Sequence, residues 1–129
     1  MHIRGASHVS FSVDDFDRSV RWYQKVFDAE VLLDEPADHR HAAVLMLPGT
    51  DLLIGICEFH ARHESSFDPT HIGLDHFAFS VDTQADLDRW AERLDGLGVA
   101  HSGAIEVPPG AILKFKDPDG IALALMWRR

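Results

Sequence analysis

The amino-acid sequence predicts an α+β protein built from two copies of a β-α-β-β-β module. The first observation is an internal repeat: shifting the chain by 68 residues aligns 8–31 with 76–99 and matches eight of 24 positions without a gap. Chance at average composition gives about one or two matches. The other two observations are a period-two pattern that opens each copy and turn residues between the last two strands of each copy. A unit of this length is too long for a solenoid repeat.

The first copy opens with segment 8–13, in which polar and apolar residues alternate as in a half-buried strand. A helix is expected next, with Asp14 or Asp15 as its N-cap. Its apolar stripe at helical spacing comprises Phe16, Val20, Tyr23 and Phe27. Three strands are expected after the helix, at about 29–34, 41–47 and 51–58, with the turn Pro48-Gly49-Thr50 joining the last two.

The second copy repeats this order, with a strand at 76–81 and a helix capped by Thr83. Gly96 and Gly98 stand where that helix is expected to end. Its stripe comprises Leu87, Trp90 or Ala91, Leu94 and Leu97. The three following strands are expected at about 99–105, 111–116 and 121–127, with a loop at 107–110 and the turn Asp117-Pro118-Asp119-Gly120.

The length of 129 residues predicts a single domain, with module 1 at about 5–58, a polar linker at 59–74 and module 2 at 75–129. The net charge of −9 without a basic stripe argues against nucleic acid as a partner. No apolar run approaches the ~20 residues of a membrane span, and the N-terminus lacks a signal-peptide core. One cysteine, Cys57, fits a cytoplasmic protein. No P-loop or dinucleotide fingerprint is present, so no nucleotide cofactor is expected.

Paired modules that each open with a strand histidine resemble the vicinal oxygen chelate superfamily. That group includes glyoxalase I, bleomycin-resistance proteins, extradiol dioxygenases and fosfomycin-resistance enzymes. The matching stretches are 8–13, 73–81 and 115–123. The resemblance implies an eight-stranded mixed sheet curled into an incomplete barrel, with helices outside and a small-molecule ligand inside. It also implies a homodimer.

The resemblance further implies a divalent metal (Fe, Mn, Ni, Co or Zn), which a substrate with oxygens on neighbouring carbons would chelate. Carried over by position, the first-strand ligands are His8 and His76. The family's usual carboxylate falls four residues past the glycine of the 117–120 turn, and Ala124 stands there. Because a methyl group cannot coordinate an ion, this ligand is missing.

Glu58 is the alternative carboxylate, and with His8 and His76 it would complete a two-His, one-carboxylate set. Which face of strand 51–58 meets the cavity stays open. Leu52, Ile54, Ile56 and Glu58 form the more apolar face, which is expected to meet the helices and to carry Glu58 away from the cavity, unless a bulge reverses it. Cys57 on the other face is expected to be a small buried hydrophobe more often than a thiolate ligand.

The remaining cavity candidates are Ser10, Cys57, Ala78, Lys114 and Ala124. Lys114 and Lys116 alternate with apolar residues, so one face of their strand is cationic and would meet an anionic ligand or water. His60 and His63 fall in the polar linker and are expected to be solvated. Asp75 is expected to point to the face opposite His76.

The resemblance implies three alternative functions. The paired histidines favour a metal-dependent lyase of glyoxalase type or an extradiol-type dioxygenase. Ala124 favours a metal-free module that binds a small molecule, or a degenerate copy that serves as a dimer scaffold. Of these, we favour a small-molecule-binding protein.

Overall fold

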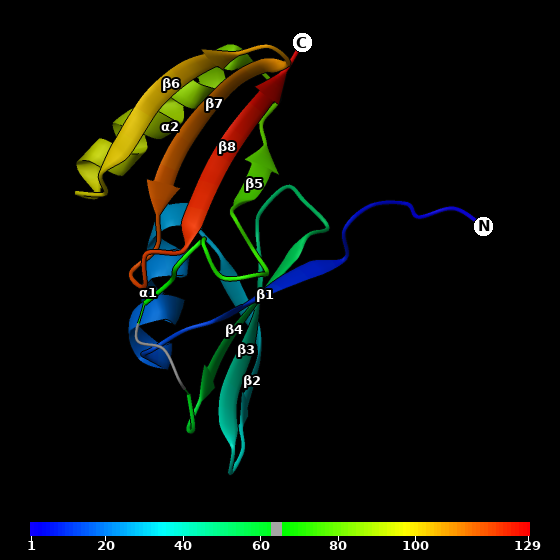
Figure 1. The fold of residues 1–129 in the computed structure, drawn as a ribbon, viewed down its shortest axis with the longest axis vertical. Helices are drawn as coiled ribbons and strands as arrows, with labels where there is room; N and C mark the ends of the chain where they lie inside the picture. Colours follow the sequence, from blue (N-terminus) through cyan, green and yellow to red (C-terminus); the bar gives the residue numbers. More distant parts are fainter. Residues whose placement is uncertain (63–65) are drawn as a thin grey trace. The chain divides into compact units, whose positions relative to one another are not determined.

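A computed structural model describes residues 1–62 and 66–129 of the chain (Figure 1). The chain divides into two compact units, unit 1 at Met1–Ser65 and unit 2 at Ser66–Arg129, and the division falls inside the expected linker. Each unit is one four-stranded sheet with one helix on one face (Figure 1). No helix among the described residues is both long enough and apolar enough to cross a membrane.

Unit 1 contains one helix and four strands, and its sheet (sheet 1) has the order β1-β4-β3-β2. Strand β1 is parallel to β4, and the other neighbours are antiparallel. The elements are β1 (His8–Ser12), α1 (Phe16–Phe27), β2 (Glu30–Pro36), β3 (Arg40–Met46) and β4 (Leu53–Phe59).

Unit 2 repeats this topology, with the order β5-β8-β7-β6 in its sheet (sheet 2) and β5 parallel to β8. The elements are β5 (Phe77–Ser80), α2 (Gln84–Gly96), β6 (His101–Val107), β7 (Gly110–Lys116) and β8 (Ala122–Arg128). The predicted pair of β-α-β-β-β modules is therefore confirmed. The strand bounds differ from the predicted ones by one or two residues at most ends, and His76 lies just before β5 instead of inside it.

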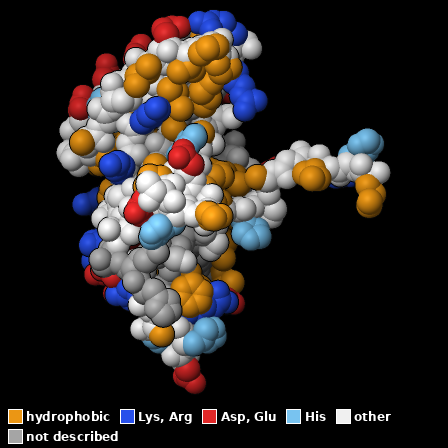
Figure 2. Space-filling view, in the orientation of Figure 1, with side chains coloured by type: hydrophobic (Ala, Val, Ile, Leu, Met, Phe, Trp, Pro, Cys, Tyr) orange, Lys and Arg blue, Asp and Glu red, His pale blue; other side chains and the backbone are white. Residues whose placement is uncertain are grey.

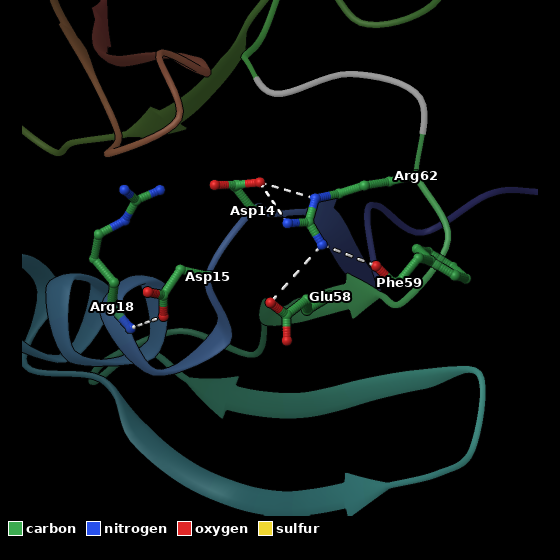
Figure 3. Close-up of polar contacts among 6 residues, drawn as sticks. All are labelled: Asp14, Asp15, Arg18, Glu58, Phe59 and Arg62. Atoms are coloured by element: carbon green, nitrogen blue, oxygen red, sulfur yellow. Dashed lines mark hydrogen bonds and ion pairs between the residues drawn. The ribbon is translucent and has the colours of Figure 1, made fainter.

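The core of unit 1 is an aromatic cluster between α1 and sheet 1. Tyr23 is fully buried, and its ring stacks on Phe11 of β1 at 5.8 Å and on Phe27 at 5.9 Å between centroids. The helix begins after Asp15, whose side chain accepts a hydrogen bond from the Arg18 backbone N–H at 2.9 Å (Figure 3). Of the two predicted candidates, Asp14 and Asp15, the N-cap is Asp15.

The core of unit 2 is mainly aliphatic, with Phe79 and Phe115 as its buried aromatic residues. Leu87 and Leu94 of α2 are fully buried, as is Leu113 of β7. The placement of Leu97 on the helix stripe is wrong: it is the C-cap and is 41% exposed, because α2 ends at Gly96. Gly98 follows with φ 70°, a left-handed conformation that favours glycine at a helix end.

Thr83 opens α2 with a reciprocal capping box. Its hydroxyl accepts from the Asp86 backbone N–H at 3.2 Å, and the Asp86 carboxylate accepts from the Thr83 backbone N–H at 2.8 Å. The hydrogen bonds from Thr83, together with the ion pair to Arg89, lower the pKa of Asp86 from 3.8 to about 2. The carboxylate therefore favours the folded state above pH 4, and this contribution is lost as the pH falls toward 2.

Thr83→Ala is expected to lower the free energy of unfolding by about 1 kcal/mol at neutral pH, because the cap of α2 is lost. It is also expected to raise the pKa of Asp86 toward its ordinary value. Urea unfolding measures the first effect and an NMR titration of the Asp86 carboxyl measures the second. Thr83→Ser retains the hydroxyl and serves as the control. An unchanged Asp86 pKa in Thr83→Ala would contradict the assignment of the hydroxyl as its main partner.

Candidate functional site

Helix α1 covers one face of sheet 1, and three candidate residues lie on the other face. Phe11 packs on α1, and its register partner Ile56 shares that face and is fully buried. Because side chains alternate along a strand, His8, Ser10 and Cys57 lie on the helix-free face. In the register of β1 and β4, His8 is opposite Leu53, Ser10 is opposite Gly55, and Ser12 is opposite Cys57. Partners in a register share a face, so Cys57 lies on the same face as His8 and Ser10.

Gly55 of β4 lets the neighbouring edge strand β1 pack closely against β4 at Ser10. A Cβ atom at Gly55 would lie 2.4 Å from Ser10 Oγ and 2.9 Å from Ser10 Cβ. Cys57 is buried one step further along β4, 4% exposed, and the Arg40 guanidinium donates to its Sγ at 3.9 Å. At Ser10, Gly55 and Cys57 the helix-free face of sheet 1 therefore has small side chains, with the Arg40 guanidinium beside Cys57.

Glu58 lies on the α1 side of sheet 1, as the apolar count along β4 predicted. Its register partner is His41, whose ring stacks on Phe16 of α1 at 3.5 Å between centroids. Its carboxylate lies 3.9 Å from Arg62. The structure therefore does not bring Glu58 and His8 together, since they are on opposite faces and five register positions apart.

Arg62 fixes the chain where it leaves β4 (Figure 3). Its Nε donates to Asp14 Oδ1 at 2.8 Å, and a terminal nitrogen donates to the Phe59 carbonyl at 3.1 Å. His60 Nδ1 contacts the Asp38 carbonyl at 2.7 Å. His60 thus has a local structural partner, and His63 lies outside the described residues.

In sheet 2, Ala78, Ala124 and Lys114 lie side by side across three strands. Ala78 pairs with Ala124, and Ala124 pairs with Lys114. Their neighbours Leu113 and Leu125 are buried on the face that α2 covers, so the three candidates lie on the helix-free face. Figure 2 shows apolar side chains gathered over β7 and β8 with Lys and Arg side chains beside them.

The two strand histidines have corresponding local contacts. Asp75 Oδ2 accepts a hydrogen bond from His76 Nδ1 at 2.6 Å, and the Ser7 hydroxyl contacts His8 Nδ1 at 3.1 Å. Ser7 and Asp75 are equivalent under the 68-residue shift. The expectation that Asp75 points away from His76 is wrong, because His76 precedes β5 and strand alternation does not apply there.

This contact determines which nitrogen His76 presents. An ionised carboxylate only accepts hydrogen bonds, so Nδ1 carries the hydrogen and Nε2 is left as the acceptor in the neutral ring. Metal-binding histidines commonly have such a carboxylate on the nitrogen that does not bind the ion. His76 is 49% exposed, so its free nitrogen is accessible.

The family model of the Glyoxalase/Bleomycin resistance protein/Dioxygenase superfamily matches residues 5–125. The chain belongs to this superfamily. A domain of the same description from Frankia sp. EAN1pec has a solved structure that is 41% identical, with a TM-score of 0.91, over 99% of this chain and 100% of that one. Metallothiol transferase FosB of Bacillus licheniformis is 32% identical over 92% of this chain and 71% of its own length. Fosfomycin resistance protein FosX of Mesorhizobium japonicum is 33% identical over 75% of this chain and 65% of its own length.

The residues around His76 in this protein do not fit the divalent metal that the resemblance implies. Strand β5, which follows His76, and the next two strands of the sheet, β8 and β7, carry no Asp or Glu. A methyl group stands at Ala124, and its register partner on the same face is the cationic residue Lys114, which does not ligate divalent ions. Within neither unit do the described residues bring together three His, Cys, Asp or Glu side chains able to hold an ion.

Sequence reasoning missed two features of the candidate site. The contact between Asp75 and His76 lies at a strand start, where a period-two pattern carries no orientation. The stacking of His41 on Phe16 is a contact between a strand and a helix, and no local pattern encodes it. Asp75, the acidic residue directly before His76, was the signal in the sequence that could have predicted their contact.

Proposed function

We propose that the protein binds a small organic molecule on the helix-free faces of its two sheets without a carboxylate-held metal. The observation that carries the proposal is the row of Ala78, Ala124 and Lys114 in sheet 2. Ala78 and Ala124 have short apolar side chains, and no Asp or Glu lies in β5, β7 or β8. His8, Ser10 and Cys57 would contribute from the helix-free face of sheet 1.

In this proposal His8 and His76 act as hydrogen-bonding groups. His76 would accept a hydrogen bond at Nε2, since Asp75 holds its Nδ1–H. Ser10 would offer a hydroxyl, and Cys57 a small apolar floor. We also propose that the protein is a cytoplasmic homodimer, as the resemblance implies; light scattering in solution tests the oligomeric state.

A metal-dependent enzyme is the second candidate, favoured by the carboxylate on His76 Nδ1. In that case His8 and His76 would supply the protein's ligands, and the metal would polarise substrate oxygens. The names of FosB and FosX denote a metallothiol transferase and a fosfomycin resistance protein, so fosfomycin is a reasonable first substrate to test.

Metal content separates the two candidates. We expect protein purified without a His-tag to hold less than about a tenth of an equivalent of Fe, Mn, Ni, Co or Zn after reconstitution, because a two-imidazole set lacks the anionic ligand that strengthens divalent binding. Elemental analysis by mass spectrometry measures this. A stoichiometric metal that disappears in His76→Ala, with the fold retained by circular dichroism, would overturn the metal-free proposal and favour the enzyme.

A further inference from the structure

We propose that the ligand is an organic anion whose charged group binds Lys114 and whose apolar part lies on the adjoining row of sheet 2. This inference rests on the proposed function and names the class of molecule for that site. It draws on three features of the helix-free face of sheet 2, namely an unpaired cation, a lack of acids and an apolar row.

Lys114 is an exposed cation with no described carboxylate as its partner. Its neighbours in the ladder are Ala124 across β8 and the bulged segment of β6, where Ser102 Oγ accepts from the Lys114 backbone N–H at 2.9 Å. Lys116 lies on the same face two residues further along β7 and is also exposed. Two unpaired lysines are notable in a chain whose net charge is −9.

The strands of sheet 2 carry no acidic side chain on this face, since Glu106 pairs with Ala111 on the α2 side. Glu106 is the one acid in the four strands of sheet 2, and it accepts hydrogen bonds from Gln84 and Arg129 at 2.9 and 2.8 Å. Asp75 is bound to His76. The Lys114 ammonium therefore has its charge available for a ligand, and an anion is the group that it would attract.

An apolar row runs beside Lys114 on the same face. Ile105 of β6 pairs with Ile112 of β7, and Ile112 pairs with Met126 of β8. Ile105 is 40% exposed, and Ile112 and Met126 are partly exposed. A molecule with an anionic group at Lys114 would extend its carbon skeleton over this row, where removing apolar surface from water stabilises binding.

The test compares phenylphosphonate with phenylacetamide, a neutral aromatic compound of similar size. We expect phenylphosphonate to bind the full-length protein more tightly, with amide shifts in β7 and β8 followed by heteronuclear NMR. Lys114→Met is expected to weaken phenylphosphonate binding by about tenfold and to leave phenylacetamide binding unchanged. Raising the salt concentration is expected to weaken only phenylphosphonate binding.

Lys25→Met is the matched control, because it removes the same charge from an exposed position in the last turn of α1. Equal losses in Lys25→Met and Lys114→Met would indicate a general charge effect and overturn the inference. Equal affinity for the two compounds, or no binding of either at millimolar concentration, would also overturn it. The metal content of the purified protein decides the proposed function separately, so the two failures are distinguishable.

Discussion

Ala124→Glu is expected to raise the affinity of the protein for Mn²⁺ by on the order of 100-fold, the scale on which metal sites respond to the loss or gain of one supporting group. The substitution places a carboxylate on the helix-free face of sheet 2, between Ala78 and Lys114, on the sheet that His76 precedes. Carboxylate and imidazole together suit a divalent transition metal better than imidazole alone. Isothermal titration calorimetry and the electron paramagnetic resonance signal of free Mn²⁺ measure the change.

Lys114 is expected to limit this gain, because its ammonium can pair with the new carboxylate. The double variant Ala124→Glu with Lys114→Met should therefore bind Mn²⁺ more tightly than Ala124→Glu alone. Ala124→Gln has nearly the same volume without the charge and reports the steric cost of filling a position that is 1% exposed. If neither Glu variant binds Mn²⁺ better than Ala124→Gln while all remain folded, position 124 does not adjoin a site able to take an ion.

Tyr23→Ala is expected to lower the free energy of unfolding by about 3–5 kcal/mol, the range for removing a large buried aromatic side chain. Tyr23 is fully buried in unit 1, stacked between Phe11 and Phe27, with the Trp22 ring at its edge 4.9 Å away. Its loss leaves a cavity that the rigid β1 and α1 backbones cannot fill. Urea unfolding followed by circular dichroism measures the effect.

Tyr23→Phe is the control for this prediction. It preserves the ring and removes only the buried hydroxyl, so a loss of about 1 kcal/mol is expected. Comparable losses for the Phe and Ala variants would show that the hydroxyl, and not the aromatic stack, stabilises unit 1. A loss below about 1 kcal/mol in Tyr23→Ala would contradict the central place of this ring in the core.

The sequence predicted the parts of the fold that depend on local periodicity. The 68-residue repeat gave the module order, and Asp15 and Thr83 mark the helix starts as expected. The composition of β4 also indicated which of its faces meets the helix. Ile54 and Ile56 are fully buried on the α1 side, and Glu58 lies on the same side. Burial of apolar side chains decides strand faces, so the apolar count favoured the face that the structure shows, while the sequence alone left a bulge open as the alternative.

Features that depend on element ends and on contacts between elements were not predictable. Leu97 fits the helical stripe by spacing, but α2 ends one residue earlier and leaves it exposed. His76 fits the strand by alternation, but β5 begins at the next residue, which frees its ring to meet Asp75. Strand and helix ends vary by one or two residues for reasons that lie in tertiary packing.

The residues that precede the two strand histidines make the halves of this duplicated protein chemically unequal. Where unit 2 has Asp75, unit 1 has Ser7, whose hydroxyl can either donate or accept a hydrogen bond. The His8 ring can consequently carry its hydrogen on either nitrogen, whereas the hydrogen bond to Asp75 favours the His76 tautomer with the hydrogen on Nδ1. The ring-nitrogen chemical shifts of His8 and His76 should differ accordingly, so the divergence of the two repeats after duplication is measurable at these two side chains.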